Sequence, residues 1–149
     1  MGGYFVGFFG GSHLVPKILQ DVGHIRTFGA LSAIASAAVL VHIIAVDPIL
    51  WTVMRLFTGF AYAGMYIVVE SWLNDKSTNE TRGQMLAVYM IITMAGLSVG
   101  QLFGGLDDGI TNILFLTVSI LVSVAVVPIL VTASPVSYTH LRAHETSGY

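Results

Sequence analysis

The sequence predicts an all-α protein, a polytopic membrane helix bundle. Composition is the first observation: 55% of the 149 residues are hydrophobic and only 9% are charged, whereas soluble domains carry about 25% charged residues. The second observation is that the apolar residues form five long stretches, and the third is that lysine and arginine occupy alternate loops. A water-soluble core is therefore excluded.

Each apolar stretch is expected to form one helix of a partial bundle over residues 1–134. A helix that crosses a bilayer needs about 20 mostly apolar residues, and the last four stretches meet that requirement. The first stretch is shorter and starts at residue 1, as expected if the complete protein continues upstream. The predicted helices cover residues 1–17, 26–46, 49–73, 83–106 and 110–132.

Two local patterns support these helix boundaries. Pro48 suits the first turn of the third helix, where a missing N–H breaks no hydrogen bond. The segment Ser77–Glu80 has the spacing of a capping box and predicts the start of the fourth helix.

Residues 135–149 are set apart as a non-native or disordered tail. The run from Val136 to Thr146 is polar and unperiodic, and it resembles one reading frame of a sequencing adapter. The spacing of His140 and His144 is therefore not interpreted as a metal site, and no metal site is predicted.

The loop charges predict an orientation. The basic residues of the first and third loops are Lys17, Arg26, Lys76 and Arg82, whereas the second and fourth loops contain only acids. Short cytoplasmic loops carry the excess of lysine and arginine. The first and third loops are therefore expected to be cytoplasmic.

Stripes of small residues predict where helices pack closely, because small side chains let backbones approach each other within lipid. Three helices carry such stripes, spaced by four residues. The last helix has no comparable stripe and is expected at the lipid-facing periphery. The stripes are Gly3, Gly7 and Gly11; Gly29, Ala33 and Ala37; and Gly96, Gly100 and Gly104, with Gly105 beside the last.

The third helix has a polar face. Arg55, Gly59, Tyr62, Tyr66 and Glu70 fall within an arc of about 80° at 100° per residue. Arg55 and Glu70 lie about 22 Å apart along the axis, too far to pair with each other. Charges within a membrane usually face a bundle interior or an aqueous cavity. This face therefore favours a transport pathway.

Each of these residues also has a plainer interpretation. Arg55 could extend to the outer interface as an anchor, and Glu70 could cap the inner interface. The two tyrosines could simply pack, and Gln101 could form a hydrogen bond between helices. His13 and His42 are expected to be structural.

Three segments resemble known sequence motifs of one transporter family. Arg55 followed by Gly59 resembles the fourth-helix motif of the major facilitator superfamily, and Gly100–Gly105 resembles its fifth-helix glycine motif. The segment Val68–Asn74, with Arg82-Gly83 and Tyr89, resembles a YcaD-like bacterial subgroup of these transporters. The resemblance covers Met1–Val131. It implies helices 2 to 6, which form part of the N-terminal six-helix half of a twelve-helix transporter fold.

The resemblance also implies a function. It implies a secondary active transporter in the bacterial inner (plasma) membrane that moves a small solute by alternating access, coupled to an ion such as H⁺. The implied partners are the lipid bilayer, the solute and the missing C-terminal half, without a cofactor and without nucleic acid. Candidates for the substrate pathway are Arg55, Tyr62, Tyr66 and Gln101. Candidates for a cytoplasmic gate are Arg26, Glu70 and Arg82.

The first cytoplasmic loop departs from the family pattern. When Gly23 is aligned with the second glycine of the family motif, Gln20 stands where the family has aspartate.

Two other classes of function compete with transport. An enzyme finds no support, because the sequence shows no paired metal ligands on one membrane face and no serine, histidine and acid set. The alternative that remains is a non-transporting membrane assembly protein that uses its small-residue stripes to bind partner helices.

Overall fold

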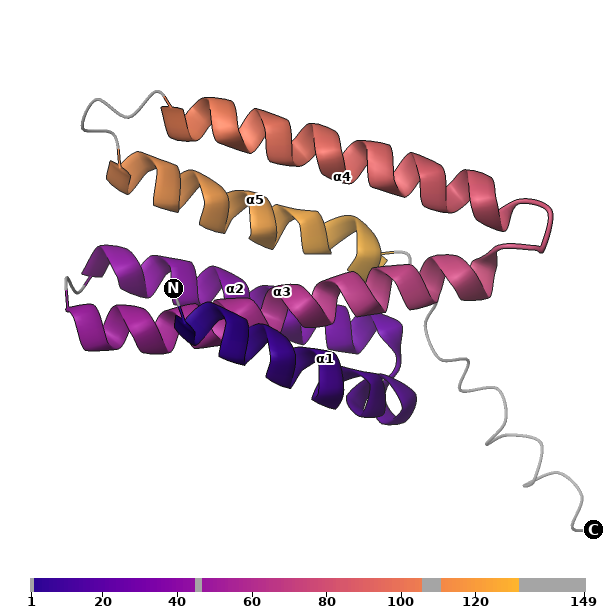
Figure 1. Cartoon of the computed structure of the whole chain (residues 1–149), viewed down its shortest axis with the longest axis horizontal. Helices are drawn as coiled ribbons and strands as arrows, with labels where there is room; N and C mark the ends of the chain where they lie inside the picture. Colours follow the sequence, from indigo (N-terminus) through magenta and orange to yellow (C-terminus); the bar gives the residue numbers. More distant parts are fainter. Residues whose placement is uncertain (1, 45–46, 106–110, 132–149) are drawn as a thin grey trace, which may run out of the picture.

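A computed structural model describes residues 2–44, 47–105 and 111–131, and in these ranges the chain is all-α, as the sequence predicts. Its five helices are α1 (Gly2–Val22), α2 (His24–Ile44), α3 (Pro48–Lys76), α4 (Arg82–Gly105) and α5 (Thr111–Val131). They run along a common long axis (Figure 1). The predicted tail at 135–149 lies outside the described residues.

The first helix is longer than its apolar stretch. It continues through Pro16 and the polar residues after it, and ends at Val22. Val15 and Leu19 are buried in the core that α1 forms with α2 and α3, so packing stabilises this last part of the helix. Gly23, with a φ of 88°, is the whole connection to α2. Only glycine adopts this backbone conformation without strain.

Both ends of α3 are capped by nearby residues. The side chain of Asp47 accepts a hydrogen bond from the Leu50 N–H at 2.8 Å, and Pro48 occupies the first turn as predicted. At the other end, the Ser77 N–H donates to the Leu73 carbonyl at 3.0 Å. Ser77 therefore ends α3, and the predicted capping box does not start α4.

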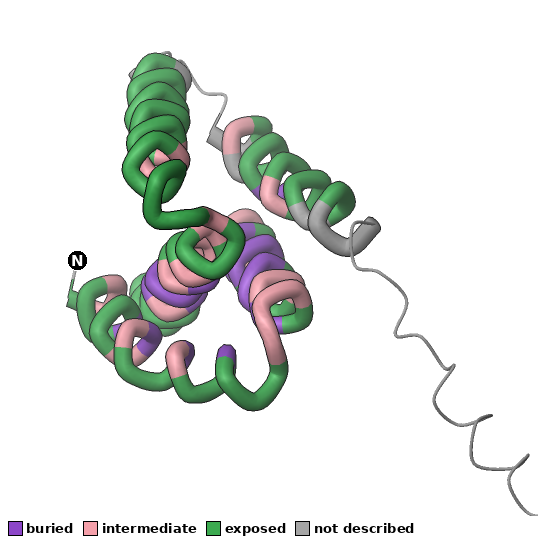
Figure 2. Tube along the Cα trace, turned by 90° about the vertical axis from the view of Figure 1, so that its right-hand side faces the viewer, coloured by how far each residue is buried: buried purple, intermediate pink, exposed green. Residues whose placement is uncertain are grey.

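Helices α1, α2 and α3 form a close group, α5 packs against α2, and α4 makes few contacts with α3. The most extensive contacts are between α1 and α3, followed by α2 with α3 and α2 with α5. Buried residues line the facing sides of α1, α2 and α3, while the tube of α4 is mostly exposed (Figure 2). The core of the group consists of Val15, Leu19, Leu31, Ala35, Ala61 and Val68.

Glycines bring α1 and α3 into backbone contact. A Cβ at Gly7 would overlap the carbonyl oxygen of Leu56, and a Cβ at Gly59 would overlap that of Tyr4. A Cβ at Gly3 would lie 2.7 Å from the Thr52 carbonyl oxygen, which is also too close. The α1 stripe therefore lies along α3, with Gly59 on the opposing side.

The packing face of α2 differs from the predicted stripe. Ala33 and Ala37 are exposed, whereas Ser32, Ser36 and Ala35 are buried. Buried serines need hydrogen-bond partners in a medium without water, and this requirement turns their face inward.

The contact between α2 and α5 depends on hydroxyl groups. The Ser36 Oγ lies 2.7 Å from the Ser119 Oγ and 3.0 Å from the Ser123 Oγ. The larger apolar side chains of α5, such as Leu121 and Val124, are exposed. This exposure is consistent with a position at the periphery of the bundle.

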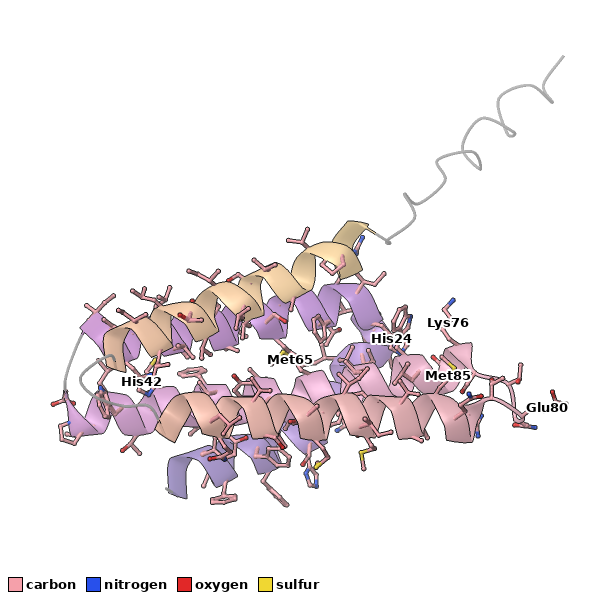
Figure 3. The ribbon with its side chains drawn as sticks, turned by 90° about the horizontal axis from the view of Figure 1, so that it is seen from above. His24, His42, Met65, Lys76, Glu80 and Met85 are labelled. Carbon is pink, nitrogen blue, oxygen red and sulfur yellow. The ribbon has the colours of Figure 1, made fainter. Side chains whose placement is uncertain are left out.

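Three of the helices are long and apolar enough to cross a membrane, judged on the described residues: His24–Ile44, Pro48–Lys76 and Arg82–Leu102. The segment Leu116–Ala125 is a shorter apolar helical stretch. In Figure 3, His24, Lys76 and Glu80 lie at one end of the bundle and His42 at the other. The first and third connections therefore share one end, as the charge pattern requires.

Candidate transport site

The polar face of α3 remains open while the rest of the helix is packed. Arg55, Tyr66 and Glu70 are exposed, and Tyr62 is half-buried. Residues on other sides of the helix, including Thr58 and Gly64, are buried against neighbouring helices. The polar residues of the predicted arc therefore lie on a surface of the bundle, whereas its glycine, Gly59, is buried against α1.

Tyr4 of α1 joins this polar face. The close approach at Gly59 places the Tyr4 backbone against α3, and Tyr4 lies near Arg55 and Tyr66. Tyr62 lies near Tyr4, Arg55 and Tyr66. Tyr4 is not among the site residues predicted from the sequence. Its position next to the Gly3 and Gly7 stripe is the signal that could have found it.

Tyr89 of α4 extends the polar face toward the end of α3. It lies near Glu70 and Tyr66. Together, Arg55, the four tyrosines and Glu70 form a series that we call the polar file; its tyrosines are Tyr4, Tyr62, Tyr66 and Tyr89. Tyr89 belonged to the resemblance motif but was not predicted as a site residue.

A cavity of about 520 Å³ lies at the Arg55 end of the polar file. Its lining residues come from the start of α1 and the start of α3. Aromatic side chains and one guanidinium supply most of the lining, which consists of Gly3, Tyr4, Phe5, Pro48, Trp51, Thr52 and Arg55. An apolar cavity with few polar groups is typical of small-molecule sites.

His42 supports one wall of this cavity. Its ring lies against that of Trp51, with centroids 5.5 Å apart and planes at 48°. The His42 Nδ1 donates to the Ala38 carbonyl at 2.7 Å, and the side chain is buried. His42 therefore has the structural role that the sequence suggested, and it also positions Trp51.

The other end of α3 carries a contact that was not predicted from the sequence. The His24 Nε2 lies 3.1 Å from the Ser71 Oγ and 3.5 Å from the Asp75 Oδ2. The gate candidates Arg26, Glu70 and Arg82 are all exposed, and the ion pair found among the described residues is His24–Asp75. A gate formed by the three candidates stays a prediction.

The α4 candidates lie on an open surface. Gln101 is exposed, and a Cβ at Gly96 or Gly100 would meet nothing within 4 Å. The side-chain surroundings of Gly104 and Gly105 lie outside the described part of the structure. Helix packing at these glycines therefore stays a prediction.

Among the described residues, no group of three or more histidine, aspartate or glutamate side chains could hold a metal ion. The polar file itself contains one guanidinium, one carboxylate and four phenol hydroxyls.

Known proteins resemble this chain along nearly its whole length. The sequence profile of the Major Facilitator Superfamily matches residues 1–146, a range that includes most of the predicted tail. An uncharacterized MFS-type transporter of Yersinia enterocolitica is 31% identical over 145 residues, or 97% of this chain and 36% of the relative.

Two further relatives agree with this match. An uncharacterized MFS-type transporter of Yersinia pestis is 29% identical over 96% of this chain and 36% of its own length. The uncharacterized MFS-type transporter YcaD of Escherichia fergusonii is 31% identical over 66% of the chain and 26% of its own length. The chain thus spans about a third of the length of the first relatives. No solved structure matches it.

Proposed function

The chain belongs to the major facilitator superfamily, and we propose that it works as part of a longer secondary active transporter in a bacterial inner membrane. This transporter moves a small solute by alternating access, coupled to an ion such as H⁺. In such transporters, two halves rock around a site near the middle of the bilayer. The chain supplies helices of the N-terminal half, and the other half completes the site.

The polar file supports this proposal most directly. It follows α3 for about 22 Å from Arg55 to Glu70, and it has apolar helix surface around it. Tyrosines from α1 and α4 add hydroxyl groups to it. Ionisable residues within membrane helices usually mark a solute or ion pathway. The exposed polar side of α3 accordingly faces the pathway.

Transport is tested with the complete reading frame in proteoliposomes. A panel of labelled sugars, amino acids, organic anions and organic cations is offered with and without an inward pH gradient. Saturable accumulation that a protonophore abolishes would support ion-coupled transport. Accumulation that ignores the gradient would reject H⁺ coupling.

Alternating access has a separate readout that needs no known substrate. Single cysteines replace Phe5 near the cavity and Trp72 near the opposite end of α3, one at a time, in an otherwise cysteine-free protein. Impermeant maleimide should label the two positions with opposite changes when the membrane is energised. Labelling that is unchanged at both positions would contradict alternating access.

Glu70 and Arg55 supply the residue-level tests. We expect Glu70→Gln to change the transport rate or the balance of inward- and outward-facing states, because it removes the one charge at its end of the file. Arg55→Ala should lower uptake in a protein that inserts normally. Normal uptake in Arg55→Ala would make Arg55 an interface anchor only.

The alternative function is a non-transporting membrane assembly protein. The open surface at Gly96 and Gly100 favours it, because a glycine face on an exposed helix suits close helix–helix contact. Co-purification of a distinct membrane protein, together with fixed maleimide labelling and no uptake of any solute, would support this alternative over transport.

A further inference from the structure

The cavity at the start of α3 combines one positive charge with aromatic walls. Its volume of about 520 Å³ lies within the range of about 300–1,000 Å³ that small-molecule sites occupy. Arg55 is the charged residue among the described lining side chains, and none of those side chains is acidic. The cavity therefore suits a ligand of opposite charge.

Arg55 has a reason to take an anion. It lies about 10 Å along α3 from Pro48, inside the apolar part of the helix. A guanidinium does not deprotonate in proteins, and a cation at such depth needs an anionic partner or water. Within the described ranges the ion pairs include none to Arg55, and Tyr4 lines the same cavity.

The aromatic walls are held in defined positions. Trp51 lies against the buried His42 ring, and Phe5 stands edge-on to Tyr4 with ring centroids 5.8 Å apart and planes at 86°. Trp51 is 37% exposed and Phe5 is 67% exposed. These rings offer apolar surface to a ligand whose charge lies at Arg55.

We infer that this cavity is a recognition subsite for a small organic carboxylate. The carboxylate pairs with the guanidinium of Arg55, and the apolar part of the ligand lies against Trp51 and Phe5. The planar fork of arginine donates two parallel hydrogen bonds to a carboxylate. One arginine balances a single negative charge, so the site favours a monoanion over a phosphate dianion. The inference rests on the proposed transport function and names its substrate class.

The test uses three small probes of nearly the same shape. Benzoate, benzamide and benzylammonium differ in charge, and their binding to the complete protein in lipid nanodiscs is measured by saturation-transfer NMR, with empty nanodiscs as the blank. We expect benzoate to bind about tenfold or more tightly than benzamide, because a charge-assisted hydrogen bond contributes about 1.5–3 kcal/mol. Benzylammonium should bind most weakly. Equal affinities for benzoate and benzamide would overturn the inference.

Variants then locate the recognition. Arg55→Gln should weaken benzoate by about 10- to 100-fold, the fold-change that corresponds to losing that hydrogen bond, and leave benzamide unchanged. Trp51→Leu should weaken both probes. Lys76→Gln removes a cation from the far end of the same helix and is the matched control, expected to bind like the unmodified protein. If the preference for benzoate survives in Arg55→Gln, the anion binds elsewhere and the inference fails.

Two further binding measurements, one with another variant and one with another probe, complete the test. Arg55→Lys retains the positive charge but lacks the planar guanidinium group. It should lose less benzoate affinity than Arg55→Gln, and it replaces that variant if Arg55→Gln does not insert into the membrane. Phenyl phosphate binding more tightly than benzoate would overturn the assignment to carboxylates.

The binding and transport results can fail separately. Benzoate binding through Arg55 without movement of any solute would leave the subsite standing and reject transport. Solute uptake with no preference for benzoate would reject the subsite and leave transport standing.

Discussion

Gly7→Ala is expected to separate α1 from α3. A Cβ at position 7 would lie 2.7 Å from the Leu56 carbonyl carbon and 3.0 Å from the Leu56 Cα, whereas ordinary contact begins at 3.4 Å. The Leu56 carbonyl oxygen would lie closer still, so the backbones must move apart locally by more than the 0.7 Å that separates 2.7 from 3.4 Å. All three neighbouring atoms belong to backbone, so no side chain can rotate away.

The cost follows from the size of this shift. Inserting a methyl group into a tightly packed contact costs about 1–3 kcal/mol, which lowers the ratio of folded to unfolded protein by about 5- to 150-fold. Alanine also favours the helix over glycine, by up to about 1 kcal/mol. The control must therefore also replace a glycine of this helix by alanine, at a position where the added Cβ meets no close atom.

Gly10→Ala is that control. It lies on the same helix, and the nearest atom to its added Cβ is the Phe60 Cδ2 at 4.0 Å. We expect Gly7→Ala to be less stable than Gly10→Ala by about 1–3 kcal/mol. Reversible unfolding by SDS in mixed micelles measures this difference. The signal is the fluorescence of Trp51 and Trp72, which both lie on α3.

A double variant tests the geometry further. At Gly59, an added Cβ would lie 2.9 Å from the Tyr4 carbonyl carbon, on the other side of the same helix contact. One separation of the helices relieves both clashes, so the double variant should cost less than the sum of the single variants. Additive costs, or equal stabilities of Gly7→Ala and Gly10→Ala, would refute the close approach of the two backbones.

Three further changes address other contacts. Ser36→Ala should destabilise the chain by about 0.6–1.7 kcal/mol in the same SDS assay, because it removes hydrogen bonds to α5; the same change at the exposed Ser98 should have no measurable effect. Asp75→Asn should change stability by less than about 1 kcal/mol, because its contact with His24 is partly exposed, and a larger loss would contradict this. Tyr66→Phe in the complete transporter should slow uptake about tenfold, the effect of losing one hydrogen bond at a critical step; uptake at the original rate would remove Tyr66 from the pathway.

The helices and the polar arc of α3 could be predicted because both are local properties. Apolar length predicts a membrane helix, and a period of 3.6 residues places Arg55, Tyr66 and Glu70 on one face. The family resemblance implies a transporter, which is the function that the polar arc of α3 also favours. None of these inferences requires knowing which helices are neighbours.

The contributions of other helices could not be predicted in the same way. Tyr4 and Tyr89 join the polar file only because α1 and α4 lie beside α3. The continuation of α1 to Val22 depends on the burial of Val15 and Leu19 by other helices, which outweighs the polar sequence after Pro16. Both cases depend on tertiary contacts between residues far apart in the sequence.

The two glycine stripes show what such a pattern can and cannot specify. The Gly3–Gly11 stripe lies against α3, and the matching Gly59 contacts α1 in return, so both sides of this contact are present. The Gly96 and Gly100 face has the same spacing, yet its surroundings are open and α4 is exposed over nearly all its described length. The stripe thus identifies the packing face of α1, whereas in α2 the exposed Ala33 and Ala37 show that the same spacing does not by itself fix which face is buried. For α4, packing at Gly96 and Gly100 stays a prediction, because a Cβ at either position would meet nothing within 4 Å.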